Sequence, residues 1–354
     1  MKDTKKARIV RALKELVLRS SRGVSRQEAA DALRIDLRTA AAHLERLTSA
    51  GLFRSETAPA EGKGRPGLIY RSNTGMLAFL GLSLSQTLTL SAMAVDASGN
   101  VLREEVRQLS GEGSRLAVFT AIRDCAAAFR TVGGKRLYGI GLAISRWLQP
   151  PLAGDDTYAN LSDYLEREIG VAVYRDVNIN AVAKACSVKL REPDLAVIHT
   201  GLVIEFGLVR GGEPQLDFAR RETWLSHLCV NPKGRQCYCG KYGCLENYVT
   251  RGALNERLKS PAAAAVKQSL GAMLASALRR LARKYQVGSL MLVGADEIFP
   301  EVERALRHDG GEPAPTLRRT AFRLNVSYGA ALEAAHFELY RFTGPGNVKF
   351  SAKP

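Results

Sequence analysis

Apolar residues recur at helical spacing near the start of the chain and predict three helices before Gly51. The first is an amphipathic helix over residues 5–20, whose buried face is predicted to carry Ile9, Leu13, Leu16 and Val17. Ser25 and Glu28 have the spacing of a capping box, which predicts a short second helix through Leu33. Asp36 can cap the third helix, which runs to about Ala50 with an apolar face at Ala40, Leu44 and Leu47.

Two short helices joined by a turn at residues 34–36 are typical of a helix-turn-helix. The outward residues of its second helix are predicted to be Arg38, Thr39, Ala42, His43 and Arg46. Arginine can donate two hydrogen bonds to guanine, and threonine or alanine can contact a thymine methyl group. Such a face favours DNA as the partner, and the alternative is a three-helix domain that binds protein.

A β-hairpin is predicted directly after these helices, with strands at residues 52–54 and 68–71. Its tip, residues 62–67, is rich in glycine and carries Lys63 and Arg65, which could reach phosphates or a narrow minor groove. Residues 1–75 are therefore predicted to form a winged helix-turn-helix domain that binds double-stranded DNA.

Strand and helix patterns alternate over the rest of the chain, which predicts an α/β fold. Two strand-rich segments, which begin near residues 79 and 196, suggest an internal duplication. A long alanine-rich helix is predicted over residues 262–286. Residues 341–354 combine glycine, proline and basic residues and are expected to form a loose basic tail.

Charge distribution supports a polyanionic partner. The chain carries 51 Lys and Arg against 35 Asp and Glu, a formal net charge of +16, and half of that excess lies in residues 1–75. No run of apolar residues is long enough to predict a transmembrane helix, and no secretory signal opens the sequence. A cytoplasmic location is therefore expected.

A cluster of cysteines predicts a metal site. Cys237, Cys239 and Cys244 lie within eight residues, and His227 can complete a set of three sulfurs and one nitrogen. That set suits structural Zn²⁺, because four protein ligands leave no open position for catalysis. Cys229 is the competing candidate for the fourth ligand.

The stretch from His227 to Glu246 resembles the zinc signature of the ROK family (repressors, open reading frames and kinases), although Ser226 replaces a glycine of that signature. The resemblance implies an actin-like (ribonuclease H-like) body of two α/β lobes, assembled as a homodimer or homotetramer. It places the first lobe at residues 76–185, completed by a helix around 325–340, and the second, with the zinc motif and the oligomerisation surface, at residues 186–324.

Departures from the family's phosphate-binding loops argue against a kinase. Ser83, Ser85 and Gln86 replace the acidic and glycine residues of the first loop. Glu205 would repel a phosphate in the second loop, and Ser145-Arg146 replaces a proline-glycine pair. No ATP binding and no enzymatic activity are therefore expected.

The sugar-binding positions of the family are only partly retained. Asp176 matches the family's general base. Arg175 replaces a neighbouring asparagine of the family and could form an ion pair with Asp176. The alternative role for Asp176 is a helix N-cap. Glu246 matches a sugar-binding glutamate, whereas Trp224 replaces another and could stack on a sugar ring. These three residues are the candidate effector contacts.

Together, these features predict a DNA-binding transcriptional regulator of carbohydrate metabolism, more specifically a repressor that recognises a palindromic site and responds to a sugar-like effector. Two alternatives stay open: a sugar kinase with an appended DNA-binding domain, and an effector-independent protein that binds DNA or a partner.

Overall fold

The computed structural model describes residues 5–58, 67–85, 88–109, 115–144, 157–215, 224–307, 314–319 and 326–340. The chain divides into two compact units. The first unit comprises residues 1–142, 148–175 and 331–354, and the second comprises residues 143–147 and 176–330. The predicted tail, residues 341–354, lies outside the described residues.

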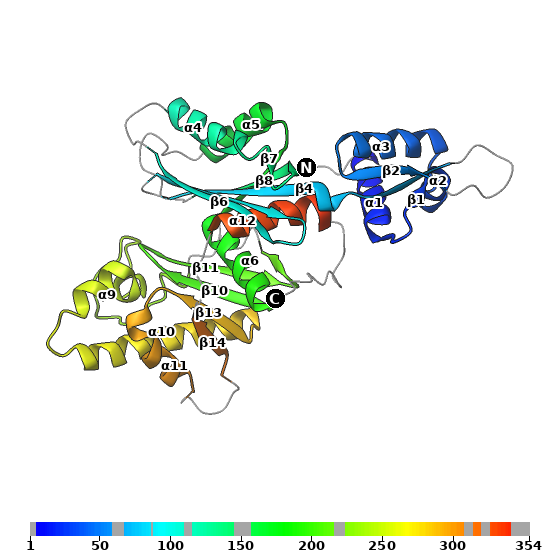
Figure 1. Cartoon of the computed structure of the whole chain (residues 1–354). Coiled ribbons are helices and arrows are strands. Elements are labelled where there is room, and N and C mark those ends of the chain that lie inside the picture. Colours follow the sequence, from blue (N-terminus) through cyan, green and yellow to red (C-terminus); the bar gives the residue numbers. More distant parts are fainter. Residues whose placement is uncertain are drawn as a thin grey trace. The chain divides into compact units, whose positions relative to one another are not determined.

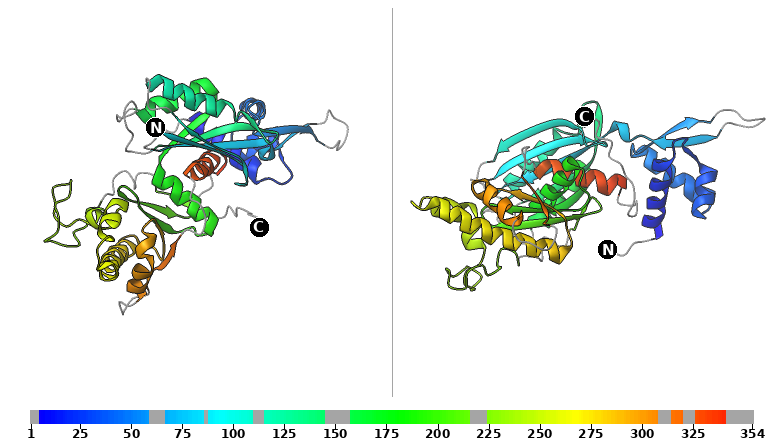
Figure 2. Two further views of the ribbon diagram at one scale, coloured as in Figure 1. Left: turned by 60° about the vertical axis from the view of Figure 1, so that its left-hand side comes forward. Right: turned by 90° about the horizontal axis from the view of Figure 1, so that it is seen from below.

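The first unit begins with three helices and a small antiparallel sheet (Figure 1). The helices are α1 (Lys5–Arg19), α2 (Arg26–Leu33) and α3 (Leu37–Ser49). The strands are β1 (Val24–Ser25), β2 (Phe53–Thr57) and β3 (Leu68–Ser72), in the order β1-β3-β2. The three helices and the two longer strands match the sequence prediction, whereas β1 is too short to leave a periodic pattern. Figure 2 shows β2 and β3 as a paired ribbon beside the helices.

Capping residues set the boundaries of α2 and α3. Ser25 and Glu28 form the predicted capping box, with the Ser25 hydroxyl accepting from the Glu28 amide and the Glu28 carboxylate accepting from the Ser25 amide. Asp36 caps α3 by accepting a 2.8 Å hydrogen bond from the Thr39 amide. The buried face of α3 consists of the predicted Ala40, Leu44 and Leu47.

The rest of the first unit is a six-stranded sheet that packs against two helices. Its strands are β4 (Leu77–Leu84), β5 (Thr89–Asp96), β6 (Val101–Gln108), β7 (Thr131–Val132), β8 (Lys135–Ile144) and β9 (Ala172–Val177). They follow the order β6-β5-β4-β8-β7, and β9 pairs with β8. Figure 1 shows α4 (Arg115–Ala127) and α5 (Thr157–Ile169) over the same face of this sheet.

The second unit is built on a five-stranded sheet of order β12-β11-β10-β13-β14. Its strands are β10 (Leu195–Thr200), β11 (Ile204–Arg210), β12 (Glu213–Pro214), β13 (Ser289–Val293) and β14 (Thr316–Arg319). Its helices are α6 (Asn178–Leu190), α8 (Glu246–Val249), α9 (Arg251–Arg257), α10 (Ala263–Tyr285) and α11 (Phe299–Arg307). Helix α12 (Val326–Ala335) starts in this unit and leads into a π-helical turn, η3 (His336–Tyr340).

Two apolar clusters fill the two faces of this sheet. On one face, α10 and α11 pack against alternate side chains of the strands, including Ile198 and Leu292. On the other face, α6 buries Ile179 and Cys186 against Val197 and Val209. Successive strand residues point to opposite faces, so a sheet covered on both sides needs nearly continuous apolar strands, as β10 and β13 are.

The division between the units falls at residues 175/176, ten residues before the lobe boundary expected from the sequence. The difference concerns α6, which that boundary cut by assigning residues 178–185 to the first lobe and residues 186–190 to the second. Its apolar side chains pack on β10 and β11, and Gly207 on β11 lets the helix approach closely, since a Cβ there would lie 2.9 Å from the Ile179 carbonyl oxygen.

Candidate functional site

Four side chains converge in the loop that leads from Trp224 to α8. The ligand atoms of His227, Cys237, Cys239 and Cys244 all lie within 4.8 Å of one another. The His227 Nδ1 to Cys237 Sγ distance is 3.6 Å, and the two sulfurs of Cys239 and Cys244 are 3.7 Å apart. Tetrahedral Zn²⁺, with bonds of ~2.3 Å to sulfur and ~2.0 Å to nitrogen, places its ligand atoms roughly 3.5–3.8 Å apart. The donor set and its spacing therefore fit a zinc ion.

Tight turns aim the cysteines at this point. The Cys237 amide donates to the Lys241 carbonyl at 2.7 Å, and the Gly240 amide donates to the Cys237 carbonyl at 2.8 Å. Gly243 has a φ of 66°, and a Cβ there would lie 1.6 Å from the Asn231 carbonyl oxygen. Only glycine fits that position, so the loop geometry depends on it.

Electrostatics favour the metal-binding form of the histidine. Burial, together with the positive charge of Lys241, lowers the pKa of His227. A lowered pKa keeps the imidazole neutral, and the neutral ring is the form that binds a metal ion.

Cys229 lies outside the four-residue group. Its thiol is exposed and is not among the clustered ligand atoms, although its backbone forms a bridge to Cys244. Of the two candidates for the fourth ligand, the geometry therefore favours His227.

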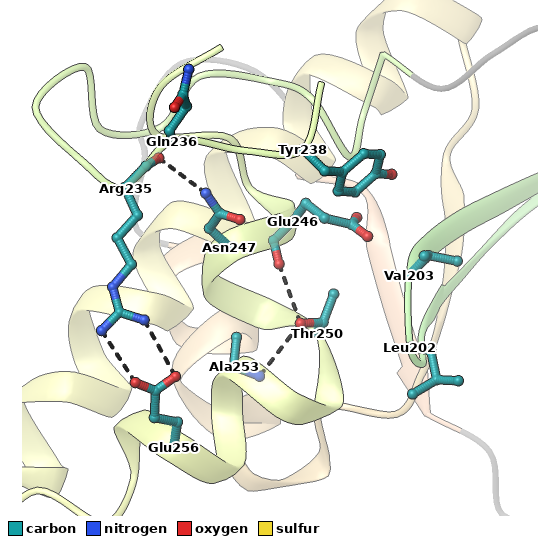
Figure 3. A pocket seen from close by; sticks show the side chains of 10 residues that line it. All are labelled: Leu202, Val203, Arg235, Gln236, Tyr238, Glu246, Asn247, Thr250, Ala253 and Glu256. Carbon is teal, nitrogen blue, oxygen red and sulfur yellow. Dashed lines mark hydrogen bonds and ion pairs between the residues drawn. The ribbon is translucent and has the colours of Figure 1, made fainter. Parts of the chain in front are cut away.

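A cavity of about 480 Å³ adjoins the loop (Figure 3). Its walls come from the loop, from α8 and α9, and from the turn between β10 and β11. The lining residues are Leu202, Val203, Arg235, Gln236, Tyr238, Glu246, Asn247, Thr250, Ala253 and Glu256. Carboxylate, amide and hydroxyl groups beside an exposed tyrosine ring are the chemistry that binds a polyol.

Glu246 links this cavity to the neighbouring turn. Its side chain is buried, and its Oε2 accepts a 3.0 Å hydrogen bond from the Ile204 amide. Burial raises the pKa of Glu246 to about 7; the nearby Glu205 acts in the same direction, and the bond from Ile204 opposes both.

The other two candidate effector residues do not line this cavity. Asp176 is buried, and its Oδ1 accepts from the Val177 amide at 2.7 Å and from the Asn180 side chain at 2.8 Å. It thus anchors the start of α6, although Val177 holds the N-cap position. Arg175 is exposed where Asp176 is buried, so the structure does not support the pairing expected between them.

Trp224 belongs to an aromatic cluster of the second unit. Its indole N–H donates to the Tyr285 hydroxyl at 2.9 Å, and its ring meets Phe206 edge-on at 6.2 Å. The Lys284 ammonium lies 4.8 Å from the ring centroid. The ring therefore packs within the protein in this structure.

The predicted contact residues on α3 differ in exposure. Arg38, Ala42 and Arg46 are exposed, whereas Thr39 and His43 are half-buried, and the Thr39 hydroxyl donates to Asp36 at 2.7 Å. The sequence interpretation missed Leu37, which is 48% exposed at the start of the helix. Its place directly after the N-cap was the available signal. Lys63 and Arg65 lie outside the described residues.

Comparisons with known proteins match part of the chain to a family. Residues 149–287 match the model of the ROK family. A curated Escherichia coli relative, the uncharacterized protein YphH, is 26% identical over 153 residues, which is 40% of this chain and 38% of that protein.

Two solved structures show the same fold. A ROK family transcriptional regulator, a homologue of the E. coli MLC protein, superposes with a TM-score of 0.68 at 18% identity, covering 95% of this chain and 97% of that one. A ROK hexokinase from Thermus thermophilus superposes with a TM-score of 0.62 at 23% identity, covering 74% of this chain and 99% of that one. These likenesses establish the actin-like α/β fold of the body.

Proposed function

Because the chain carries a ROK family domain over residues 149–287, we propose that it is a transcriptional repressor whose N-terminal winged helix-turn-helix binds a palindromic DNA site. The observation that carries this proposal is the exposed face of α3. Arg38, Ala42 and Arg46 point outward there, on a helix fixed by its Asp36 cap and by three buried core residues. A capped helix with two exposed arginines suits the major groove.

The experiment that tests this function is selection of genomic DNA fragments by the purified full chain at about 0.15 M salt. Enrichment of a palindromic site supports a sequence-specific DNA-binding regulator, and half-sites about one helical turn apart are expected for a symmetric dimer. Salt-sensitive binding without any enriched site would leave the basic domain as an electrostatic anchor and reject sequence-specific regulation.

In this function the metal is structural. His227, Cys237, Cys239 and Cys244 would hold Zn²⁺ with no open coordination position, so the ion would stiffen the loop that walls the cavity. We found no described helix long and apolar enough to span a membrane, and we place the protein in the cytoplasm with its DNA.

A sugar-like effector would occupy the cavity beside Glu246 and act by binding the DNA-competent and DNA-incompetent states with different affinity. Glu246→Gln and Asp176→Asn form a matched pair of isosteric variants, one in the cavity and one buried outside it. Thermal shifts against a broad sugar panel should weaken in Glu246→Gln and persist in Asp176→Asn. No shift with any sugar in the unaltered chain would favour the effector-independent alternative.

A sugar kinase is the second candidate, supported by the retained Asp176 and by the likeness to a hexokinase fold. The turn between β10 and β11 opposes it. The Gly201 amide donates to the Val203 carbonyl at 3.1 Å and the Ile204 amide donates to Glu246, so these donors are engaged within the protein and not presented to a phosphate. Sugar-dependent ATP turnover that Asp176→Asn abolishes would establish the kinase instead.

A further inference from the structure

Cys229 faces the metal-site residue Cys244 across a short antiparallel bridge. The Val230 amide donates to the Gly243 carbonyl at 2.8 Å, and the Leu245 amide donates to the Leu228 carbonyl at 2.9 Å. Because these two hydrogen bonds lie on either side of the cysteines, Cys229 and Cys244 form a non-hydrogen-bonded pair of the antiparallel bridge. In such a pair the Cα atoms are ~4.5 Å apart and both side chains lie on the same face.

That geometry meets the requirement for a disulfide, whose Cα atoms usually lie ~4.4–6.8 Å apart. Cys229 and Cys239 are both exposed, but Cys239 belongs to the four-residue metal group, so Cys229 is the exposed thiol outside that group and the expected point of attack. The thiols of Cys125, Cys186, Cys237 and Cys244 are buried, which shields them from a peroxide in solution.

We propose that Cys229 is an oxidation site at which a peroxide drives formation of a Cys229–Cys244 disulfide that removes Cys244 from the metal group. The Cys229 thiolate attacks the peroxide O–O bond, which gives a sulfenic acid and releases one hydroxide. The Cys244 thiol then attacks the Cys229 sulfur and gives up its proton, so that the S–S bond forms as the S–O bond breaks and hydroxide leaves. The two thiols lose two electrons to hydrogen peroxide, which becomes two water molecules once both hydroxides are protonated.

The disulfide would leave three ligands and release the metal ion. Glu246 lies two residues beyond Cys244 and binds the Ile204 amide, so loss of the loop geometry would also alter the cavity. These consequences rest on the proposed zinc occupancy, whereas disulfide formation depends only on the placement of the two cysteines.

Oxidation of the full-length protein with hydrogen peroxide tests this proposal. Trypsin separates the cysteines of the loop into three peptides, residues 222–233, 236–241 and 242–251. We expect mass spectrometry without reduction to find peptide 222–233 linked to peptide 242–251. A chromophoric chelator should detect release of one zinc per chain in parallel.

The Cys229→Ser variant is the matched test, because it removes one sulfur outside the metal group. We expect it to lose the linked peptide and to release zinc more slowly. Alkylation of Cys229 before oxidation should have the same effect in the unaltered chain. A bond between Cys239 and either neighbour, with Cys229 unlinked, or equal zinc release in Cys229→Ser, would overturn the proposal. Protein purified without zinc would contradict the metal assignment alone, because the linked peptide would still report on the disulfide.

Discussion

At the level of single residues, helix α3 uses different side chains to stay folded and to face solvent. Thr39 sits on the predicted contact face, yet its hydroxyl and amide both bind Asp36 and hold the helix start. The side chains of Arg38 and Arg46 are exposed and are not assigned to the cap. The two arginines are therefore the residues on which sequence discrimination is expected to depend.

Replacing Arg38 or Arg46 by alanine should cost ~1–3 kcal/mol of specific DNA binding and relax discrimination at one base position. The reason is loss of a bidentate contact to a base. Fluorescence-anisotropy titrations of the selected DNA site and of its single-base variants measure both the lost affinity and the lost discrimination. Arg307→Ala, which removes an exposed charge from the second unit, is the control.

Lys63→Ala and Arg65→Ala should behave differently, weakening binding to all sequences alike and flattening its salt dependence. Phosphate contacts carry charge and no sequence information, which is the physical reason. An unchanged salt slope would show that the hairpin tip does not touch the DNA backbone.

At the level of elements, short-range caps and one long-range ion pair fix the N-terminal helices. The capping box of α2 is local to four residues. By contrast, Lys14 on α1 bonds Glu338 on η3 at 2.8 Å, and Tyr174 on β9 donates to the same carboxylate. The side chains of Lys14 and Glu338 are only 12% and 11% exposed, so this contact ties α1 to the body of the first unit.

The capping box should give α2 a dependence on pH. The hydrogen bond from the Ser25 amide, aided by Arg22, lowers the pKa of Glu28 below its ordinary value of 4.5. A lowered folded-state pKa means that the stabilisation is present above pH 4.5 and is lost as the pH falls through the folded value. Ser25→Ala should cost ~1 kcal/mol at neutral pH, measured as amide-exchange protection of α2. The difference between Glu28→Gln and the unaltered chain should shrink in acid; a constant difference would rule out this linkage.

Breaking the Lys14–Glu338 ion pair should lower the free energy of unfolding more than breaking an exposed ion pair does. Lys14→Met leaves a buried carboxylate without its cation, which costs ~3–5 kcal/mol in comparable sites. Denaturant unfolding of the full chain measures this loss of stability. Arg19→Met breaks an exposed pair with Glu15 in the same helix and should cost under ~1 kcal/mol. Equal effects of the two variants would mean that the Lys14 contact is solvent-screened.

At the level of the whole molecule, the two units share a strand arrangement. Each sheet begins with an antiparallel meander, β6-β5-β4 in the first and β12-β11-β10 in the second. This agrees with the two strand-rich starts in the sequence. The units differ in their additions: the N-terminal helices belong to the first, and the metal-binding loop belongs to the second.

Loss of the metal should therefore destabilise the second unit selectively. Cys239→Ser removes one ligand and should abolish the zinc content of about one ion per chain, since metal binding is coupled to folding. Hydrogen exchange should show lost protection in residues 224–250, with the sheet of the first unit unchanged. Retention of one zinc per chain in Cys239→Ser would refute the ligand assignment.

The local features of the fold could be predicted from the amino-acid sequence. Helix caps, the α2–α3 turn and the alternating strands depend on residues within one or two turns of each other, so periodicity and spacing reveal them. The same holds for the three clustered cysteines. The signal was weakest for β1 and β14, which are short and owe their pairing to distant partners.

Contacts between residues far apart in the chain became evident from the three-dimensional structure. It placed His227, and not Cys229, with the cysteines, and it set Glu246 in the cavity while Asp176 and Trp224 pack elsewhere. It also placed the whole of α6 in the second unit. The physical reason is that such choices depend on burial and on contacts between segments far apart in the chain, which sequence spacing does not encode.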